Sequence, residues 1–519
     1  MGAITLLMSF QVKFPTGEDL RWRNAPVRSV AAVSLWAVAL LVLLPGLILQ
    51  SDGARLSVPL AVQGVVLGHT GVALIRVLTA TTVRLTALGF WVFAYVWLGL
   101  APLAQLATDT YPWAYRTGQG TALTAVAVVE LGLLAHSAGA AVAARRERAR
   151  TAAGPAAPSP GPVERLLSRR LAPWRLLSLC GLALALAAVL IPSQPGGMSA
   201  YFTSREALRE AGSADGSDNA FLSALRSWSL SVPAFWALLG LLHVPRVPGG
   251  DRLLRGVRRL LLPLLLALNV VVNNPVSKPR FWFGTVLLTL LFAVPRLSRP
   301  RAFRVIAATL MASVLLLFPY SDYFRYSDRE QFTVVSLSAQ FTANGDYDAF
   351  QQVQTGIDMA RDQGFSPQDA LGPVLFAVPR SVWPDKPGDT GITLAQYAGY
   401  DFLNLSAPLW IESYLWAGPP TVAAVFFLLG AAGRRMDDVR HRLRDRAGTL
   451  ATFLVPAFAF YQIVFLRGSL LGIVGPLTLL VTVPLLVTTP GARAARLVPS
   501  AQPTAPTRPV QLPGTGGHP

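Results

Sequence analysis

The chain contains a series of apolar stretches, each about 17–24 residues long, separated by polar segments. An α-helix rises about 1.5 Å per residue, so a stretch of this length crosses a hydrocarbon layer about 30 Å thick. A helix satisfies its own backbone hydrogen bonds in lipid, whereas a β-barrel shows short segments of alternating polarity. The sequence therefore predicts an all-α polytopic membrane protein.

The pattern predicts about twelve transmembrane helices. We place them at 30–49, 56–78, 85–106, 121–143, 174–191, 226–243, 260–273, 281–295, 304–319, 409–432, 450–466 and 469–488. The second stretch is interrupted by Gln63, His69 and Arg76. The seventh and eighth are short and separated only by residues 273–280, so they form either a hairpin or one helix broken at membrane depth.

Arginine-rich segments follow the even-numbered helices. They lie at residues 145–170, 246–259, 296–304 and 434–446, and a basic leader precedes the first helix. Because cytoplasmic loops carry an excess of Lys and Arg, both termini are expected in the cytoplasm. The resulting layout is a cytoplasmic leader (1–29), nine helices (30–319), a large extracytoplasmic loop (320–408), three helices (409–488) and a disordered cytoplasmic tail (489–519).

Charge and composition exclude several classes of function. Only 14% of residues are charged, whereas a soluble domain has about 25%. The net charge of +18 does not indicate nucleic-acid binding, because the charges form short clusters in alternate loops and no basic face with interleaved aromatics exists. The one cysteine, Cys180, excludes a disulfide within the chain, and His69 has no acid or second histidine near it in the sequence. We expect neither a metal nor a cofactor.

The loop at 320–408 is too patterned for a passive linker. It holds eleven acidic and five basic residues, the reverse of the cytoplasmic loops. A turn at Asn344-Gly345 is followed by a predicted helix at 346–364, and Ser366 with Pro367 then resembles a helix start. The apolar segment 370–378 is suited to the membrane surface.

The loop also carries a cluster of groups suited to a phosphorylated sugar. Arg380, Trp383, Asp385 and Lys386 lie within seven residues, among three prolines. Arginine makes bidentate hydrogen bonds to phosphate oxygens, lysine adds a point charge, and an indole ring presents an apolar face on which a sugar ring can stack. The alternative is an interfacial anchor, since Trp, Arg and Lys favour the headgroup zone.

Further charged residues lie at the outer ends of helices. Glu412 is an acid at the membrane boundary, where an ionisable group indicates function and a cationic partner is expected, although the helix dipole alone also favours an acid there. Arg280 and Arg467 are outer-side cations that either bind a diphosphate or extend to the interface. Asp346-Tyr347-Asp348 is similar to the metal-binding Asp-x-Asp of sugar transferases, but acids are also common at a helix start.

Several of these residues resemble those of the bacterial O-antigen and exopolysaccharide repeat-unit polymerases (the Wzy type). They are Pro379-Arg380, the run Trp383-Pro384-Asp385-Lys386-Pro387, Pro408 with Glu412 before a helix, and Arg467-Gly468. About twelve spans with one large outer loop between late helices is also that family's layout. The resemblance covers approximately residues 270–480, and the first eight helices match only in hydropathy.

The resemblance implies metal-independent glycosyl transfer outside the cytoplasm, at the bacterial plasma membrane. A glycan on undecaprenyl diphosphate would be the donor and a lipid-linked repeat unit the acceptor, with a chain-length regulator and a flippase as partners. The cations expected to hold the diphosphate are Arg280, Arg325, Arg380, Lys386 and Arg467. Trp383 would stack on sugar, and Glu412 or Asp385 would be the base.

Two other classes of function fit the same pattern. One is another lipid-linked glycosyltransferase or an O-antigen ligase, which shares the lipid-diphosphate donor. The other is a polysaccharide flippase or transporter, since twelve spans with both termini inside is also a transporter's layout. Transporters usually show internal repeats and charged or broken helices at the midplane, whereas here the polar groups concentrate in the outer loops.

Overall fold

The computed structural model describes ten stretches of the chain, which are almost entirely helical. They are residues 27–50, 53–153, 160–194, 196–203, 220–244, 252–294, 297, 299–316, 335–403 and 405–490. Arg325 and the first part of the predicted outer loop lie outside the described residues, as do most of the predicted leader and tail.

The first four predicted spans are each a continuous helical rod. Two of them contain a π-helical stretch, η2 and η3 respectively. The bounds are α2 (Val27–Val38), η2 (Ala39–Leu43) and α3 (Leu44–Leu49); α4 (Val58–Leu78); α5 (Leu85–Phe93), η3 (Ala94–Leu100) and α6 (Ala101–Thr108); and α7 (Gln119–Ala152).

The next five predicted spans are also helices, with short elements between them. The bounds are α8 (Pro162–Leu167), α9 (Pro173–Leu190), η5 (Ser199–Phe202), α11 (Ala220–His243), α12 (Arg252–Val272), α13 (Arg280–Phe292) and α14 (Pro300–Leu316). Helices α12 and α13 are separate, and α13 packs chiefly against a late helix, α21. The segment between them is therefore a connection between two helices with different neighbours.

The described part of the predicted outer loop consists of short helices. They are α15 (Leu337–Ala343), η7 (Gly345–Tyr347), α16 (Ala349–Gln363), η8 (Pro367–Ala370), α17 (Leu371–Val374) and α18 (Thr390–Tyr397). The predicted helix ends as expected at Gly364, whose φ of 84° suits glycine. Ser366 makes no side-chain cap, and the short 3₁₀ turn η8 precedes α17.

The last helices are α19 (Leu409–Ala417), α20 (Pro419–Arg442), α21 (Leu450–Arg467) and α22 (Leu470–Leu486). The prediction of one helix over 409–432 is wrong, because the chain bends at Gly418 with a φ of 77° and restarts with two prolines. Strands β1 (Arg170–Leu171) and β2 (Thr488–Thr489) form an antiparallel pair that joins the start of α9 to the end of α22.

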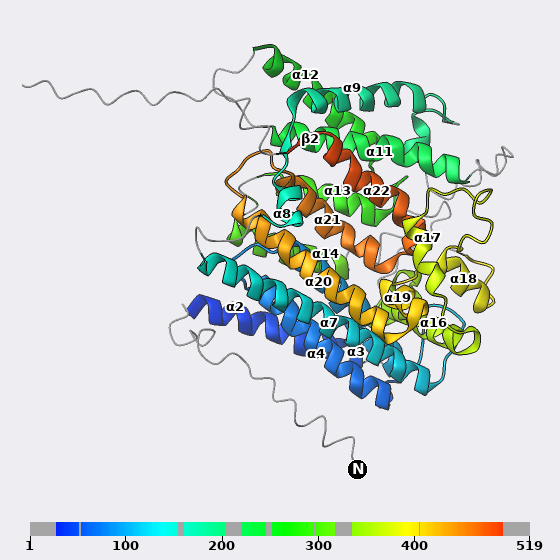
Figure 1. Cartoon of the computed structure of the whole chain (residues 1–519). Helices are drawn as coiled ribbons and strands as arrows, with labels where there is room; N and C mark the ends of the chain where they lie inside the picture. Colours follow the sequence, from blue (N-terminus) through cyan, green and yellow to red (C-terminus); the bar gives the residue numbers. More distant parts are fainter. Residues whose placement is uncertain are drawn as a thin grey trace, which may run out of the picture.

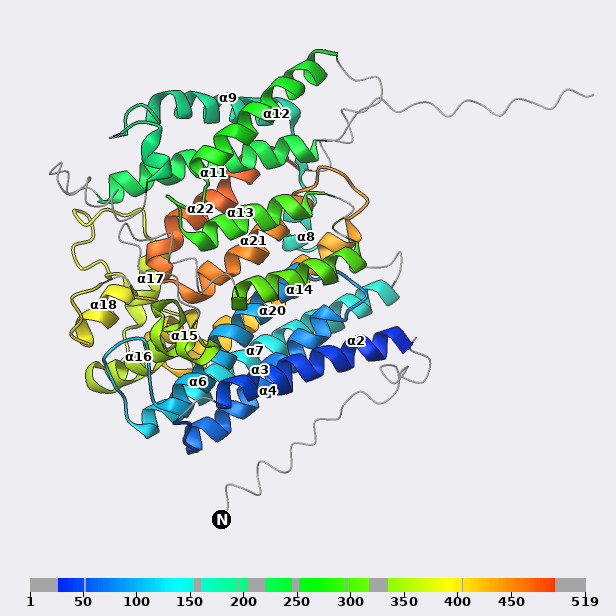
Figure 2. The same ribbon diagram turned by 180° about the vertical axis from the view of Figure 1, so that it is seen from behind.

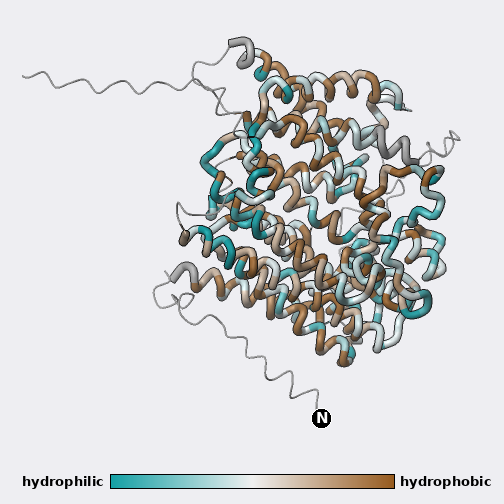
Figure 3. Tube along the Cα trace, in the orientation of Figure 1, coloured by the Kyte–Doolittle hydropathy of each residue, from teal (hydrophilic) through white to brown (hydrophobic). Residues whose placement is uncertain are grey.

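Six helical rods in the described part of the chain are long and apolar enough to cross a membrane, by length and composition. They are Val30–Leu49, Val58–Leu78, Leu85–Thr108, Gln119–Ala152, Pro173–Leu190 and Leu450–Arg467. Apolar residues dominate the middle of the bundle, and polar residues gather at its two ends (Figure 3). The protein is therefore a helical membrane protein.

The helices are held together by close backbone contacts at small residues. A Cβ atom added to Gly430 on α20 would lie 2.0 Å from the carbonyl oxygen of His136 on α7, and one added to Gly139 would lie 2.0 Å from that of Phe427. Gly89 on α5 faces the backbone of α21 in the same way. Small residues permit this approach in membranes, where packing replaces the hydrophobic effect between helices.

The short helices α15–α19 gather at one end of the bundle (Figures 1 and 2). The C-terminal ends of α7 and α20 lie at the opposite end (Figure 1). The ends of the bundle are thus chemically distinct. One is built from the acidic segment 335–408, which we call the outer segment after its predicted location, and the other carries arginine-rich helix ends.

Candidate functional site

The turn between α21 and α22 lies at the centre of a polar cluster. The guanidinium of Arg467, at the end of α21, donates hydrogen bonds to the carbonyl oxygens of Gly345 and Asp346, each at 3.0 Å. Its Nη2 also lies 3.2 Å from Oδ1 of Asp348. One side chain thus fastens the 3₁₀ turn η7 of the outer segment to the helical bundle.

A second arginine reaches the same segment. Nη2 of Arg280, the first residue of α13, lies 2.6 Å from Oδ2 of Asp346, and Nη2 of Arg467 lies 3.7 Å from Oδ1. The Arg467 guanidinium also lies 5.7 Å from the ring centroid of Phe281, which follows Arg280. Arg280 and Arg467 therefore converge on Asp346 from positions 187 residues apart in the sequence (467 minus 280).

Asp348 connects three further segments. Its side chain is 1% exposed, and its carboxylate accepts hydrogen bonds from Ser406 Oγ at 2.6 Å and Trp113 Nε1 at 3.1 Å, in addition to Arg467. A buried carboxylate is stable only when its lone pairs are filled in this way. Asp346 and Asp348, which the sequence offered as a metal motif, are held by arginines in this structure.

Glu412 lies on the other side of the same turn. It is 2% exposed, and its carboxylate accepts hydrogen bonds from Ser469 Oγ at 3.2 Å and from the N–H of Leu470 at 3.0 Å. It belongs to α19, which is not one of the six candidate spans. Burial raises the pKa of Glu412 to about 8, although hydrogen bonds from Thr390 and Leu470 oppose this shift.

A second carboxylate, that of Asp389, lies at the start of α22 beside Glu412. Asp389 caps α18, because its Oδ1 accepts the N–H of Gly391 at 2.9 Å. Its Oδ2 lies 2.7 Å from the position that a Cβ on Gly472 would occupy. The negative charge of Asp389 contributes to the raised pKa of Glu412. The first turn of α22 is therefore flanked by two carboxylates, one buried and one partly accessible.

The predicted cluster at 380–386 has a different role in the structure. Arg380 is exposed and donates to the carbonyl oxygens of Lys386 at 2.7 Å and Pro387 at 3.3 Å. Nζ of Lys386 donates to those of Phe376 at 2.6 Å and Val378 at 3.0 Å. Both cations hold the shape of their own loop and, among the described residues, form no ion pair with the Arg280–Asp346–Arg467 group.

Trp383 and Asp385 occupy the same loop. Trp383 is half-buried and Asp385 is exposed. The loop packs back on α17, since a Cβ on Gly372 would lie 3.4 Å from Pro387. Of the predicted site residues, the structure thus brings together Arg280, Arg467 and Glu412, and leaves the 380–386 loop as a separate, self-supported feature.

Sequence reasoning did not connect several members of the cluster. Asp389, Thr390, Ser406 and Ser469 belong to it, and Asp346 and Asp348 are counter-ions for the two arginines. The sequence did contain one signal for these pairs. The predicted outer loop is acidic, and two arginines predicted on the same side needed counter-ions, so the acids beside the predicted turn at Asn344-Gly345 were candidates. We define the polar cluster as Arg280, Asp346, Asp348, Asp389, Thr390, Ser406, Glu412, Arg467 and Ser469.

No protein-family model, curated protein or solved structure matches the chain that carries this polar cluster.

Proposed function

We propose that the protein is a glycosyltransferase that polymerises lipid-linked oligosaccharide repeat units at the extracytoplasmic face of the bacterial plasma membrane. The observation that supports this most directly is the position of Glu412, a buried carboxylate on α19 that accepts hydrogen bonds from Ser469 and Leu470, in the turn that follows Arg467. A base and two cations around one turn are the groups that transfer from a lipid diphosphate requires.

Each group has a defined part in the proposed reaction. Glu412 accepts the proton of the acceptor hydroxyl, whose oxygen attacks the anomeric carbon of the donor. The bond from that carbon to the diphosphate oxygen breaks, and the lipid diphosphate leaves with the bonding electrons. The reactive form is the ionised fraction of Glu412, and its raised pKa of about 8 makes that carboxylate a stronger base than an ordinary glutamate.

Arg280 and Arg467 stabilise the leaving diphosphate. Asp346 holds both guanidinium groups in fixed positions before substrate arrives, so little reorganisation is needed when negative charge develops. Both arginines stay partly accessible, with side chains 17% and 19% exposed. The exposed Asp385 lacks the burial that raises the pKa of Glu412, and we therefore assign the base to Glu412.

The 380–386 loop forms the rim of the site. Trp383 offers its ring to sugars of the growing glycan, and Arg380 and Lys386 keep the loop stiff through bonds to its carbonyl oxygens. The proposed topology has twelve spans with both termini in the cytoplasm, and α20 is the tenth. In that arrangement the polar cluster faces outward, where flipped lipid-linked repeats are found.

The test is to replace Glu412 by Gln and, separately, Arg467 by Gln in a strain that depends on this chain for its polymer. We expect a loss of long polymer of about 100-fold or more in each, with single lipid-linked repeat units accumulating. The control is Arg148→Gln, which removes one charge from an exposed position on the far part of α7. Each variant is quantified in membranes.

Normal polymer from well-expressed Glu412→Gln and Arg467→Gln variants would contradict the site assignment. Product length separates the alternatives. A ligase variant would leave complete polymer attached to its lipid, whereas a polymerase variant leaves only single repeats. Single repeats confined to the cytoplasmic leaflet would instead indicate a flippase.

A further inference from the structure

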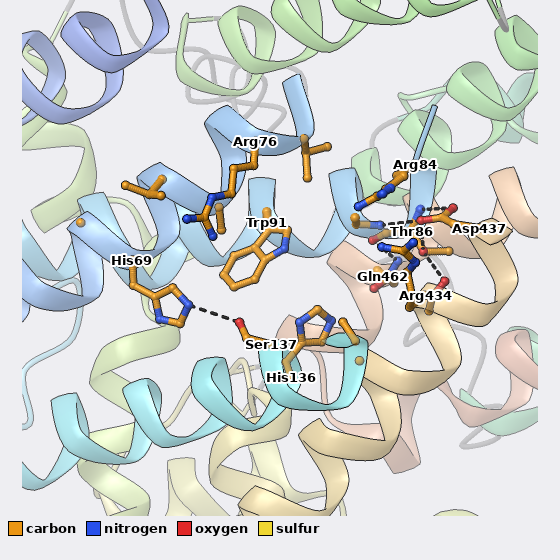
Figure 4. Close-up of a pocket in the computed structure, with 18 residues that line it drawn as sticks. His69, Arg76, Arg84, Thr86, Trp91, His136, Ser137, Arg434, Asp437 and Gln462 are labelled. Carbon is orange, nitrogen blue, oxygen red and sulfur yellow. Dashed lines mark hydrogen bonds between the residues drawn. The ribbon is translucent and has the colours of Figure 1, made fainter. Parts of the chain in front are cut away.

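A cavity of about 550 Å³ lies among α4, α5, α7 and α20 (Figure 4), and none of its lining residues belongs to the polar cluster. Its lining includes Arg76 from α4, Arg84 at the start of α5, and Arg434 from α20. Arg76 lies in the last turn of α4 and Arg434 in the second half of α20, whose C-terminal end is at the end of the bundle opposite to α15–α19 (Figure 1). The cavity is therefore distinct from the site proposed for glycosyl transfer.

The lining carries a surplus of positive charge. Three arginines face one acid, Asp437, and that acid already binds the start of α5. Its oxygens accept the Thr86 hydroxyl at 2.6 Å and the N–H groups of Thr86 and Ala87 at 3.1 and 3.3 Å. Asp437 is thus occupied by the backbone that it caps, and it neutralises the arginines only in part.

The arginines themselves differ in their partners. Arg434 pairs with Asp438 at 2.8 Å. Arg76 is exposed and Arg84 is half-buried, and within the described residues neither side chain forms a hydrogen bond or a close ion pair. In Figure 4, Arg84 and Arg434 lie near each other at one side of the cavity and Arg76 at another. The like charges of Arg84 and Arg434 repel each other, and an anion bound beside them would stabilise both.

A second observation points to a ligand. His136 lines the cavity, is 6% exposed, and its Nδ1 has no hydrogen-bond partner in the described part of the chain. Its ring is fixed by stacking on Phe90, at 3.5 Å between centroids and 4° between planes. Buried polar atoms normally have a partner, so the imidazole is a polar group of the cavity wall whose hydrogen bonding is left incomplete by the described residues.

The remaining wall is both ordered and partly apolar. His69 is held on both sides, by Glu130 at 2.8 Å and by Ser137 Oγ at 3.2 Å, which corrects the expectation that it has no acid near it. Trp91 lies beside both histidines, and Val72 is 38% exposed on the outer surface of α4. The cavity therefore combines a cationic end with an apolar side that reaches the bundle surface.

We propose that this cavity binds a phosphate or diphosphate group carried by an amphiphile. A guanidinium group can donate two parallel hydrogen bonds to a pair of phosphate oxygens. It is also planar and weakly hydrated, so it loses little solvation energy in a confined site. The volume exceeds that of a bare ion and falls in the range of pockets for small organic ligands, about 300–1,000 Å³. Val72 and Trp91 contact the apolar part of the ligand, which enters beside α4.

The test uses the purified full-length chain in neutral detergent. Dihexanoyl phosphatidic acid is the amphiphilic probe, inorganic pyrophosphate the soluble probe, and dihexanoyl glycerol the uncharged control. Binding is measured by titration of the thermal midpoint and by calorimetry. We expect phosphatidic acid to bind, and the double variant Arg76→Gln/Arg84→Gln to lower its affinity at least tenfold. Arg148→Gln, an exposed arginine outside the cavity, should leave affinity unchanged.

The outcomes separate the sources of the phosphate. Arginine-dependent binding of phosphatidic acid alone supports an amphiphile, whereas arginine-dependent binding of pyrophosphate alone overturns that part of the proposal and leaves a soluble phosphate. Equal loss with Arg148→Gln, or binding of dihexanoyl glycerol as strong as that of phosphatidic acid, overturns it entirely. If the double variant does not fold, the same affinities are measured on two single variants, Arg76→Gln, which changes an exposed position, and His136→Gln.

Discussion

Glu412 was expected to pair with a cation, but the groups that bind its carboxylate are neutral. The sequence suggested a cationic partner for it, but its carboxylate receives hydrogen bonds from a hydroxyl, a backbone N–H and the side chain of Thr390. The nearby charge that acts on its pKa is that of Asp389, which is also negative. A carboxylate removed from water without a cation holds its proton more tightly than in solution.

The raised pKa makes stability depend on pH. The folded state holds the proton of Glu412 up to about pH 8, whereas the unfolded chain releases it near the ordinary value of 4.5. This contribution is therefore fully present below pH 4.5 and lost as pH rises through 8. We expect Glu412→Gln to reduce the fall in thermal midpoint between pH 6 and pH 9. The difference should be equivalent to a few kcal/mol, because a tenfold change in proton affinity corresponds to about 1.4 kcal/mol.

The comparison for that experiment is Asp385→Asn, at an exposed position in the same segment. It should leave the pH dependence as it is in the unmodified chain. An unchanged slope in Glu412→Gln would show that Glu412 is ionised throughout this range.

Asp348 illustrates the opposite case, a buried carboxylate with a cation. Asp348→Asn keeps the shape of the side chain but leaves Arg467 with Asp346 as its remaining acidic partner. Breaking a buried pair costs about 3–5 kcal/mol, so we expect a clearly lower stability in detergent. Asp445→Asn removes an exposed partner of Arg444, at 87% and 64% exposed, and should change stability little. Equal effects would indicate that Asp348 is solvated.

At the scale of elements, close approach of α7 and α20 requires glycine. Gly430→Ala places a Cβ against the backbone oxygen of His136, which cannot move without displacing α7. Gly64→Ala on α4 meets nothing within 4 Å. We expect the first substitution to destabilise the protein by about 1–3 kcal/mol and the second to be neutral or stabilising by up to about 1 kcal/mol. Thermal midpoints in detergent test this difference, and similar midpoints would contradict it.

The sequence located the helices well because their signal is local. Within the described residues, eleven of the twelve predicted stretches each correspond to one helical rod, and the stretch at 409–432 corresponds to two helices, α19 and α20. The break at Gly418 was missed because the apolar pattern continues across it, although Gly418-Pro419-Pro420 carried the signal of one helix ending and another beginning. The extension of α7 to Ala152 was missed because its last turns are polar and face water.

The polar cluster was harder to predict because its pairs join distant residues. Arg280, Arg467 and Glu412 could be recognised singly, as charges at the ends of apolar stretches. Their partners could not, since Arg467 and Asp348 are 119 residues apart in sequence and no local pattern connects them. Arg380 and Lys386 instead donate to carbonyl oxygens of their own segment, a contact that the charge pattern alone does not reveal.

At the scale of the whole molecule, the arginine-rich segments that follow alternate predicted helices predict how the protein is oriented in the membrane. Cys180 is buried and is the one cysteine, so Cys180→Ala gives a background for single-cysteine labelling. In intact cells we expect a membrane-impermeant maleimide to label Ser381→Cys, an exposed position of the outer segment. Asp445→Cys, at the opposite end of the bundle, should react only after permeabilisation.

The reverse pattern would invert the proposed orientation. Labelling of both positions in intact cells would show that an even number of spans lies between them, and the twelve-span count would be wrong. Western blots of each variant establish equal amounts before labelling is compared.

The contact between Arg467 and Asp348 also fixes the order of assembly. The ribosome releases the carboxylate long before the guanidinium, because 118 intervening residues must first be made (467 minus 348, minus one). Until α21 is made, the nascent outer segment lacks its bonds to Arg467, whereas Arg280 and Trp97, which also contact Asp346, precede it in the chain. A prematurely terminated product that stops before residue 467 can retain most of its apolar helices, yet it cannot complete the buried network. The arginine that completes the polar cluster is therefore made long after the segment that it holds.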